Sequence, residues 1–124
     1  MNTNLEQVRE LVSEAIGGKA YLAYPQKKIQ TELPFAVVSI SASSYLQDKD
    51  SKDIMTLLTY TVRIFAEGQR DLLGLADAVA ESLSRYRIRL LGSTPMYSDP
   101  TYGPMVLLTF DTILDRRSNS FITG

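Results

Sequence analysis

Apolar residues recur along this chain with two different periods, and the changes of period divide it into expected helices and strands. A helical period runs through residues 5–16, where apolar side chains return every three or four positions. Thr3 and Glu6 have the spacing of a capping box at the start of this helix, and Gly17-Gly18 supplies a stop. A second helix is expected over 71–84, with an apolar stripe at Leu72, Leu75, Ala76, Val79 and Leu83.

Period-two patterns predict four strands, at 35–43, 54–67, 87–91 and 105–114, and a short extended piece is an option at 21–24. In the second strand, Leu58, Tyr60, Val62 and Ile64 alternate with more polar positions. The order is helix-strand-strand-helix-strand-strand. It predicts an α+β fold with two helices packed on one face of a small, mainly antiparallel four-stranded sheet. Residues 1–115 form the expected single domain, and 116–124 form a C-terminal tail.

Two polar stretches interrupt the pattern, at 43–53 and 92–104, and both are expected to be loops within the domain. Apolar side chains in polar loops often anchor interfaces, although packing within the loop explains them equally well. The first loop carries Tyr45 and Leu46, and the second carries Met96, Tyr97 and Tyr102.

The composition limits the kinds of functional site that this chain can form. The chain has 124 residues, with 13 basic and 14 acidic residues, no Cys and no His. The near-neutral charge argues against binding to DNA or anionic lipid by bulk charge. The missing residue types exclude disulfides, cysteine nucleophiles and histidine bases. The sequence shows neither a secretory signal nor an apolar run long enough to span a membrane, so a soluble protein made in a cytoplasm is expected.

Carboxylates offer only weak candidates for a site. Asp48, Asp50 and Asp53 resemble a calcium loop but lack its glycine and final glutamate, so no metal site is assigned. Asp111 and Asp115 share one face of a strand and could pair as acid and base, but solvated surface positions are the favoured explanation. No phosphate-binding motif is present. We therefore expect no enzyme activity, no catalytic residues and no cofactor.

Charged and apolar residues near the loops and the tail are candidates for contact with partners. A row of arginines at 85, 87 and 89 either grips a partner's acidic groups or keeps an outward strand face soluble. The tail is expected to leave the sheet after Asp115 and dock on another chain. The candidate contact residues are Tyr45, Leu46, Asp48, Lys49, Asp50, Lys52, Arg85, Arg87, Arg89, Met96, Tyr97, Tyr102, Arg116, Arg117, Phe121 and Ile122.

The chain resembles the tail terminator proteins of long-tailed bacteriophages, also called tail completion or neck proteins. The resemblance covers roughly residues 4–115 and rests on element order, size and strand character. It is carried by the N-terminal helix and by the segments Pro-Phe-Ala-Val-Val-Ser-Ile (34–40), Leu-Thr-Tyr-Thr-Val-Arg-Ile-Phe-Ala (58–66), Leu-Gly-Leu-Ala-Asp-Ala-Val-Ala-Glu-Ser-Leu (73–83) and Leu-Leu-Thr-Phe-Asp-Thr-Ile-Leu-Asp (107–115).

The resemblance implies a structural virion protein that forms a hexameric ring, caps the tail tube and joins it to the head connector. The implied partners are further copies of the chain, the tail tube protein and the head connector or stopper protein, with the sheath as a further candidate. It implies no membrane contact and no sequence-specific contact with nucleic acid, although DNA can pass through such a ring. The implied location is the tail or neck of the virion, and the host cytoplasm during assembly. The alternatives are a head–tail connector or stopper protein, and a small ligand-binding or regulatory α+β domain.

Overall fold

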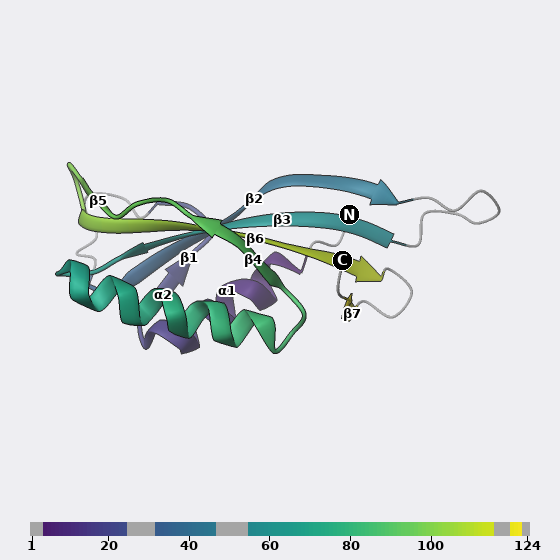
Figure 1. Ribbon diagram of the computed structural model, residues 1–124, viewed down its shortest axis with the longest axis horizontal. Helices are drawn as coiled ribbons and strands as arrows, with labels where there is room; N and C mark the ends of the chain where they lie inside the picture. Colours follow the sequence, from purple (N-terminus) through teal and green to yellow (C-terminus); the bar gives the residue numbers. More distant parts are fainter. Residues whose placement is uncertain (1–3, 25–31, 47–54, 116–119, 123–124) are drawn as a thin grey trace.

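Two helices lie against one face of a mixed sheet in the computed structural model (Figure 1). The structure describes residues 4–24, 32–46, 55–115 and 120–122. For 42–46, 55, 115 and 120–122 it describes the backbone alone. The α+β class and the placement of both helices on one face agree with the sequence-based prediction.

The strands run in the order β1-β2-β3-β6-β4, and two further short strands, β5 and β7, pair with β6 on the side where β4 lies. All described pairs are antiparallel except β1 with β2, which is parallel. The strands are β1 (Lys19–Tyr21), β2 (Phe35–Leu46), β3 (Met55–Phe65), β4 (Arg89–Ser93), β5 (Tyr97–Asp99), β6 (Gly103–Asp115) and β7 (Ser120–Ile122).

The prediction of a four-stranded sheet is therefore wrong, because three strands of three residues each join the four longer ones. Strand β1 lies at 19–21 instead of 21–24 and pairs in parallel with the start of β2. Strand β5 lies inside the expected 92–104 loop, where Asp99 Oδ2 accepts hydrogen bonds of 2.9 Å from the backbone N–H groups of Thr101 and Tyr102. This Asx turn reverses the chain into β6, so most of the expected loop forms a hairpin.

Both helices end where the sequence predicts. Helix α1 (Leu5–Ile16) stops at Gly17, whose φ of 65° lies in the left-handed region and whose N–H donates to the Ser13 carbonyl at 3.1 Å. Its N-cap is Asn4, and Thr3 lies outside the described residues. Helix α2 (Gln69–Ser84) begins two residues earlier than expected.

The core lies between the helices and the sheet, and strand alternation decides which side chains enter it. Val8, Val12 and Ile16 of α1 and Leu72, Val79 and Leu83 of α2 pack on it. The sheet contributes the positions that point toward the helices: Ala36 and Val38 of β2, Leu58, Tyr60, Val62 and Ile64 of β3, and Val106, Leu108, Phe110 and Leu114 of β6. The alternation predicted for 58–64 is confirmed.

Strands β2 and β3 form a long hairpin whose far half continues beyond the helices (Figure 1). The register runs from Phe35 opposite Phe65 to Leu46 opposite Met55, with a shift between Ile40 and Ala42. Strand β6 follows β3 over the same length. Residues 43–46 therefore belong to β2 and not to the expected 43–53 loop, and 47–54 lie outside the described residues.

The C-terminal segment does not leave the sheet as predicted. Strand β7 pairs antiparallel with the end of β6, with Phe121 opposite Leu114 and Ile122 opposite Ile113. The expectation that the tail docks on another chain is wrong for the backbone of 120–122. The end of β6 offers its free backbone groups to this segment of the same chain, so the segment pairs there.

Candidate interaction surfaces

Strand β4 is the most exposed strand of the sheet for which side chains are described. It is the last strand of the main path, so in the described part of the chain no strand pairs with its outer side. All five of its residues are exposed, including Leu90 at 42% and Leu91 at 52%. The register shifts between Leu90 and Gly92, which leaves Leu91 without an opposite residue on β6. A bulge of this kind locally twists an edge.

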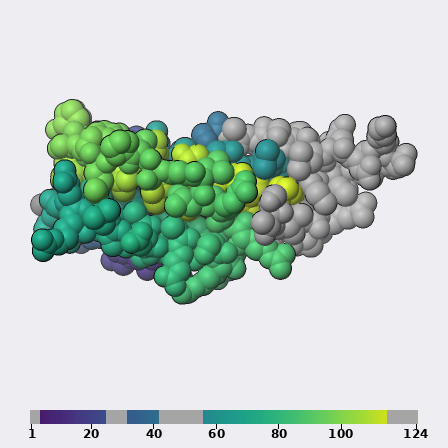
Figure 2. Space-filling model, viewed as in Figure 1, coloured from purple at the N-terminus to yellow at the C-terminus, as the bar shows by residue number. Residues whose placement is uncertain are grey.

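An apolar groove runs between α2 and β4, and we refer to it as the α2–β4 groove. Two adjoining hollows share Ala80 and Leu90, so the groove follows the length of the helix. Figure 2 shows α2 and β4 side by side on the face toward the viewer. The walls are Leu72, Leu73, Ala76, Asp77, Ala80, Glu81 and Ser84 from α2, and Arg87, Ile88, Arg89, Leu90, Ser93, Thr94, Pro95 and Met96 from the following chain, with Val106 and Leu108 at the base.

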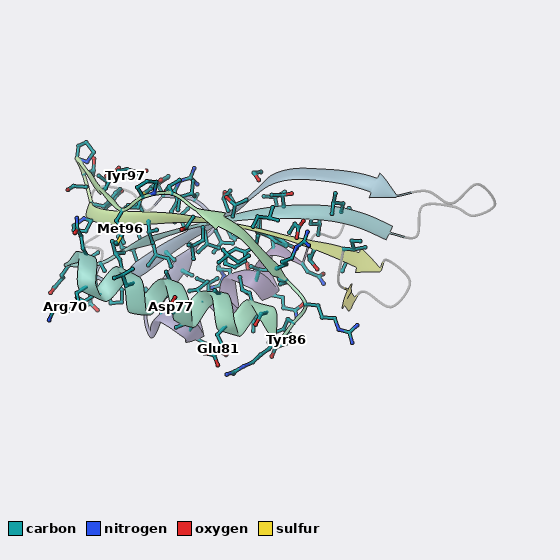
Figure 3. All side chains as sticks on the ribbon, in the orientation of Figure 1. Arg70, Asp77, Glu81, Tyr86, Met96 and Tyr97 are labelled. Carbon is teal, nitrogen blue, oxygen red and sulfur yellow. The ribbon has the colours of Figure 1, made fainter. Side chains whose placement is uncertain are left out.

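The side chains of the groove come from α2 and from the chain that follows it (Figure 3). Asp77 and Glu81 lie in its helix wall, and the exposed Tyr86 follows the end of α2. The partly buried Met96 lies near the first turns of the helix and is followed by the exposed Tyr97 (Figure 3). Arg70, in the first turn of α2, borders a different hollow with Leu33 and Pro34. Leu73 on α2 is 58% exposed, so the rim is apolar as well as charged.

The three arginines predicted to share a strand face do not do so. Arg85 caps α2, with its N–H bonded to the Glu81 and Leu83 carbonyls, and its guanidinium pairs with the Glu81 carboxylate at 2.7 Å. Arg87 has a φ of 64°, in the left-handed region, and its carbonyl accepts a hydrogen bond from Thr112 Oγ1 at 2.9 Å. Only Arg89 belongs to a strand. The alternating residues therefore end helix α2 and lead the chain into β4, and they do not form one strand.

Arg89 forms a two-point ion pair with Asp111 of β6, with distances of 3.1 Å from Nε to Oδ1 and 3.0 Å from Nη2 to Oδ2. The hydrogen bond to Asp111 raises the pKa of Arg89 above its ordinary value. This pair assigns Asp111 a structural partner, so the hypothesis of an Asp111–Asp115 acid–base pair gains no support. The side chain of Asp115 lies outside the described ones.

The candidate residues of the second loop separate into buried and exposed members. Met96 is partly buried and packs against the main core. Tyr102 packs among the aromatic rings on the opposite face of the sheet, 5.3 Å from Phe35 and 5.4 Å from Phe65 between ring centroids. Tyr97 is 49% exposed and remains a contact candidate. Local loop packing thus accounts for two of the three.

Several aromatic rings pack together on the sheet face away from the helices, and this cluster was not predicted from the sequence. Phe35 and Phe65 stack at 4.6 Å between centroids on the sheet face away from the helices, and Tyr21 and Tyr24 add rings from the β1 side. Tyr24 stacks on Tyr102 at 6.0 Å and is 48% exposed. The signal available in the sequence was the apolar position Phe65, which breaks the polar half of an otherwise alternating strand.

For several predicted contact residues the structure describes the backbone alone, and others lie outside its described range. Tyr45 and Leu46 lie at the end of β2, and Phe121 and Ile122 lie in β7, by backbone position alone. The remaining ones lie outside the described residues: Asp48, Lys49, Asp50, Lys52, Arg116 and Arg117.

The described residues include no group of three or more acidic, His or Cys side chains placed to hold a metal ion. Among the same residues, no helix is both long and apolar enough to cross a membrane. The outer side of β4 is unpaired by any described strand, and an edge of this kind can bind another polypeptide as an added strand.

No protein-family model matches this chain, and no curated protein matches it significantly.

Proposed function

We propose that this chain is a structural subunit of a bacteriophage tail, a tail terminator that forms a ring, caps the tail tube and joins it to the head connector. Support comes first from the resemblance in element order, strand character and size. The observed succession of α1, β2, β3, α2, β4 and β6 agrees with the elements that carry this resemblance.

The observation that carries the proposal is the projecting end of the β2–β3 hairpin together with β6. These strands extend beyond the helices that cover the rest of the sheet (Figure 1). A strand ribbon without helical cover gains stability when another surface packs on it. A subunit with such a projection can touch a tube or connector while its body contacts neighbouring copies.

The experiment is an assay of tube capping. Purified protein is added to elongating tail tubes made from tail tube protein, and tube ends and lengths are measured by negative-stain electron microscopy. A terminator gives tubes with a ring density at one end and a narrower length distribution. Tubes that elongate unchanged, with no density at either end, contradict the proposal.

Removal of residues 46–52 from the hairpin is the matched variant. We expect its circular dichroism spectrum and melting behaviour to remain close to those of the full chain, because the helix-covered core is untouched. Capping should be lost. Normal capping by this variant contradicts a role for the hairpin.

The stopper alternative and the ligand-binding alternative predict different results. A stopper binds the connector end and leaves tube elongation unchanged. A ligand-binding domain remains a monomer in solution and does not bind tubes. Mass measurement by light scattering, with and without tubes, separates these cases.

A further inference from the structure

Most of the large apolar side chains that stay exposed in the described part of the chain lie beside the two edges of the sheet. Leu22, at 42% exposure, follows β1 at one edge. Tyr24 is an exception, because its ring lies against Phe65 and Tyr102 on the face away from the helices. The others flank β4 and the α2–β4 groove at the opposite edge: Leu73, Tyr86, Leu90, Leu91 and Tyr97. In the described chain β1 and β4 are the terminal strands of the main path. Exposed apolar residues beside an unpaired strand are features of an interface.

The directions of the strands make the two edges compatible. Strand β1 runs parallel to β2, and three successive antiparallel pairs lead from β2 through β3 and β6 to β4. Strands β1 and β4 therefore run in opposite directions. If two copies lie side by side with their sheets continuous, β4 of one copy meets β1 of the next in antiparallel orientation. Antiparallel pairs are slightly more stable per residue than parallel ones.

The α2–β4 groove gives this contact a place for side chains. A strand added to an edge places alternate side chains on the two faces of the sheet. On the helix side these side chains enter a groove with Ala76, Ala80 and Leu90 in its walls. Ala20, the middle residue of β1, already faces its own core. Leu22 is the next residue of the same parity and is exposed.

Arg87 beside β4 and the carboxylates beside β1 can pair across such a contact. Beside β4, Arg85 pairs with Glu81 and Arg89 pairs with Asp111, and among the described residues no ion pair involves Arg87. Asp77 in the groove wall balances the charge of Arg87, so this edge is neutral overall. Beside β1, α1 exposes three carboxylates, at Glu6, Glu10 and Glu14, against the cations Arg9 and Lys19. The β1 edge therefore has an excess of negative charge toward which the Arg87 guanidinium of another copy can turn.

We propose that the outer edge of β4 and the α2–β4 groove bind the β1 edge of a second copy of this chain. The contact is heterologous, so the same pair of surfaces repeats from copy to copy and closes into a ring when the rotation permits. This inference rests on the ring in the proposed function and deepens it by naming the two surfaces that meet.

The test uses the absence of cysteine from the natural chain. Two single variants, Leu22→Cys and Leu91→Cys, place one thiol at each edge. They are treated separately and as an equal mixture with a short bismaleimide cross-linker at high protein concentration. We expect about tenfold more cross-linked dimer in the mixture than in either single variant, because a heterologous contact does not bring the same surface of two copies together.

A third variant controls for random collision. Ser41→Cys carries its thiol at an exposed position of β2, on the same side of the sheet as β1. A head-to-tail contact does not bring two positions on that side together, so its mixture with Leu22→Cys should give only background product. Circular dichroism of each variant checks that it is folded. Reduction before cross-linking excludes disulfides formed during purification.

Two outcomes overturn the inference. Efficient cross-linking of Leu91→Cys with itself indicates a β4–β4 contact around a two-fold axis. Failure of the mixture to exceed the control shows that the edges do not meet. The proposed function is tested separately by tube capping. If the mixture gives the cross-linked dimer but the protein does not cap tubes, the edge contact stands and the proposed function is wrong. If the protein caps tubes but the mixture gives no such dimer, the proposed function stands and the edge contact is wrong.

Discussion

Two adjacent glycines join α1 to β1 for different physical reasons. Gly17 ends the helix in the left-handed conformation, where a Cβ would meet no atom within 4 Å but would strain the backbone. Gly18 has no such backbone requirement. A Cβ there would overlap the carbonyl oxygen of Pro34, which precedes β2. Close approach at Gly18 is what allows β1 to pair in parallel with β2, beginning with Lys19 opposite Phe35.

Substitution of Gly18 by alanine should therefore lower the free energy of unfolding by about 1–3 kcal/mol, the usual cost of inserting a methyl group into a packed site. Chemical denaturation measures the change. The matched control is Gly74→Ala in α2, where a Cβ meets nothing within 4 Å. Helix propensity predicts a gain of up to about 1 kcal/mol there. Equal stability of the two variants contradicts the close approach of Gly18 to Pro34.

The stability of the protein at alkaline pH depends on Tyr60 in the core. Its side chain is fully buried, and burial raises the pKa of its phenol well above the ordinary value of 10.0. The folded state therefore holds the proton to higher pH than the unfolded state does. The stabilisation is fully present below the unfolded pKa of about 10 and is lost as pH rises above it.

The Tyr60→Phe variant removes this titration, so its free energy of unfolding should fall less between pH 9 and 11 than that of the unaltered chain. One proton held by the folded state alone corresponds to about 1.4 kcal/mol per pH unit. Urea unfolding at several pH values measures the slope. The control is Tyr86→Phe, which alters an exposed side chain. An unchanged slope in Tyr60→Phe would show that other groups account for alkaline unfolding.

At the scale of elements, α2 has two roles that adjacent residues separate. Leu72 is fully buried in the core, whereas Leu73 is 58% exposed on the rim of the α2–β4 groove. Leu72→Ala should cost about 2–5 kcal/mol of unfolding free energy through lost burial and a cavity. Leu73→Ala should change stability by no more than about 0.5 kcal/mol.

Measurement of both stability and assembly distinguishes these roles. If the groove binds a second copy, Leu73→Ala weakens association seen by light scattering while its melting temperature stays the same. Loss of stability in Leu73→Ala comparable to that in Leu72→Ala would show that Leu73 belongs to the core.

The helices and long strands could be predicted because their periods depend on one buried face, as at Leu72, Val79 and Leu83. The three short strands could not. Strand β1 depends on the distant Pro34, and β7 on the end of β6, so neither leaves a local pattern. Strand β5 had a usable signal in the Asp99-Pro100 turn before Gly103, which has a φ of 89°.

Some candidate contact residues were predicted correctly and others were not, because several of them depend on tertiary packing. Arg85, Arg87 and Arg89 alternate with apolar residues as a strand does, but Ile88 bonds through its N–H to the Leu83 carbonyl as the helix ends. Local period cannot distinguish this termination from a strand. The α2–β4 groove arises between two elements, so only tertiary packing defines it. The exposed Tyr97 could be predicted because it lies in a polar segment.

At the scale of the whole molecule, the two proposed kinds of contact use different directions. Contacts between copies run across the strands, from β4 of one copy to β1 of the next. The β2–β3 hairpin projects along the strands, beyond the helices (Figure 1). A ring joined through its sheet edges would leave the hairpins free for another partner. Removal of 46–52 should therefore abolish capping and leave the cross-link between Leu22→Cys and Leu91→Cys unchanged.

Charge reversal tests the polarity of the contact between copies. In a head-to-tail contact Arg87 of one copy lies toward the carboxylates of α1 on the next, so Arg87→Glu should weaken association about two- to fivefold at low salt, the effect of one exposed ion pair. Adding Glu10→Lys in the same chain should restore part of the loss, since every contact then contains both reversed charges. Salt should reduce both effects, because exposed charges are screened.

The control is Arg70→Glu, which makes the same change in net charge at an exposed position in the first turn of α2. Sedimentation equilibrium at two salt concentrations gives the association constants. Arg87→Glu weakening association no more than Arg70→Glu would assign the effect to net charge alone. Further weakening by Glu10→Lys would place α1 outside the contact, because in a correctly oriented interface the second reversal must restore part of the association that the first one removed.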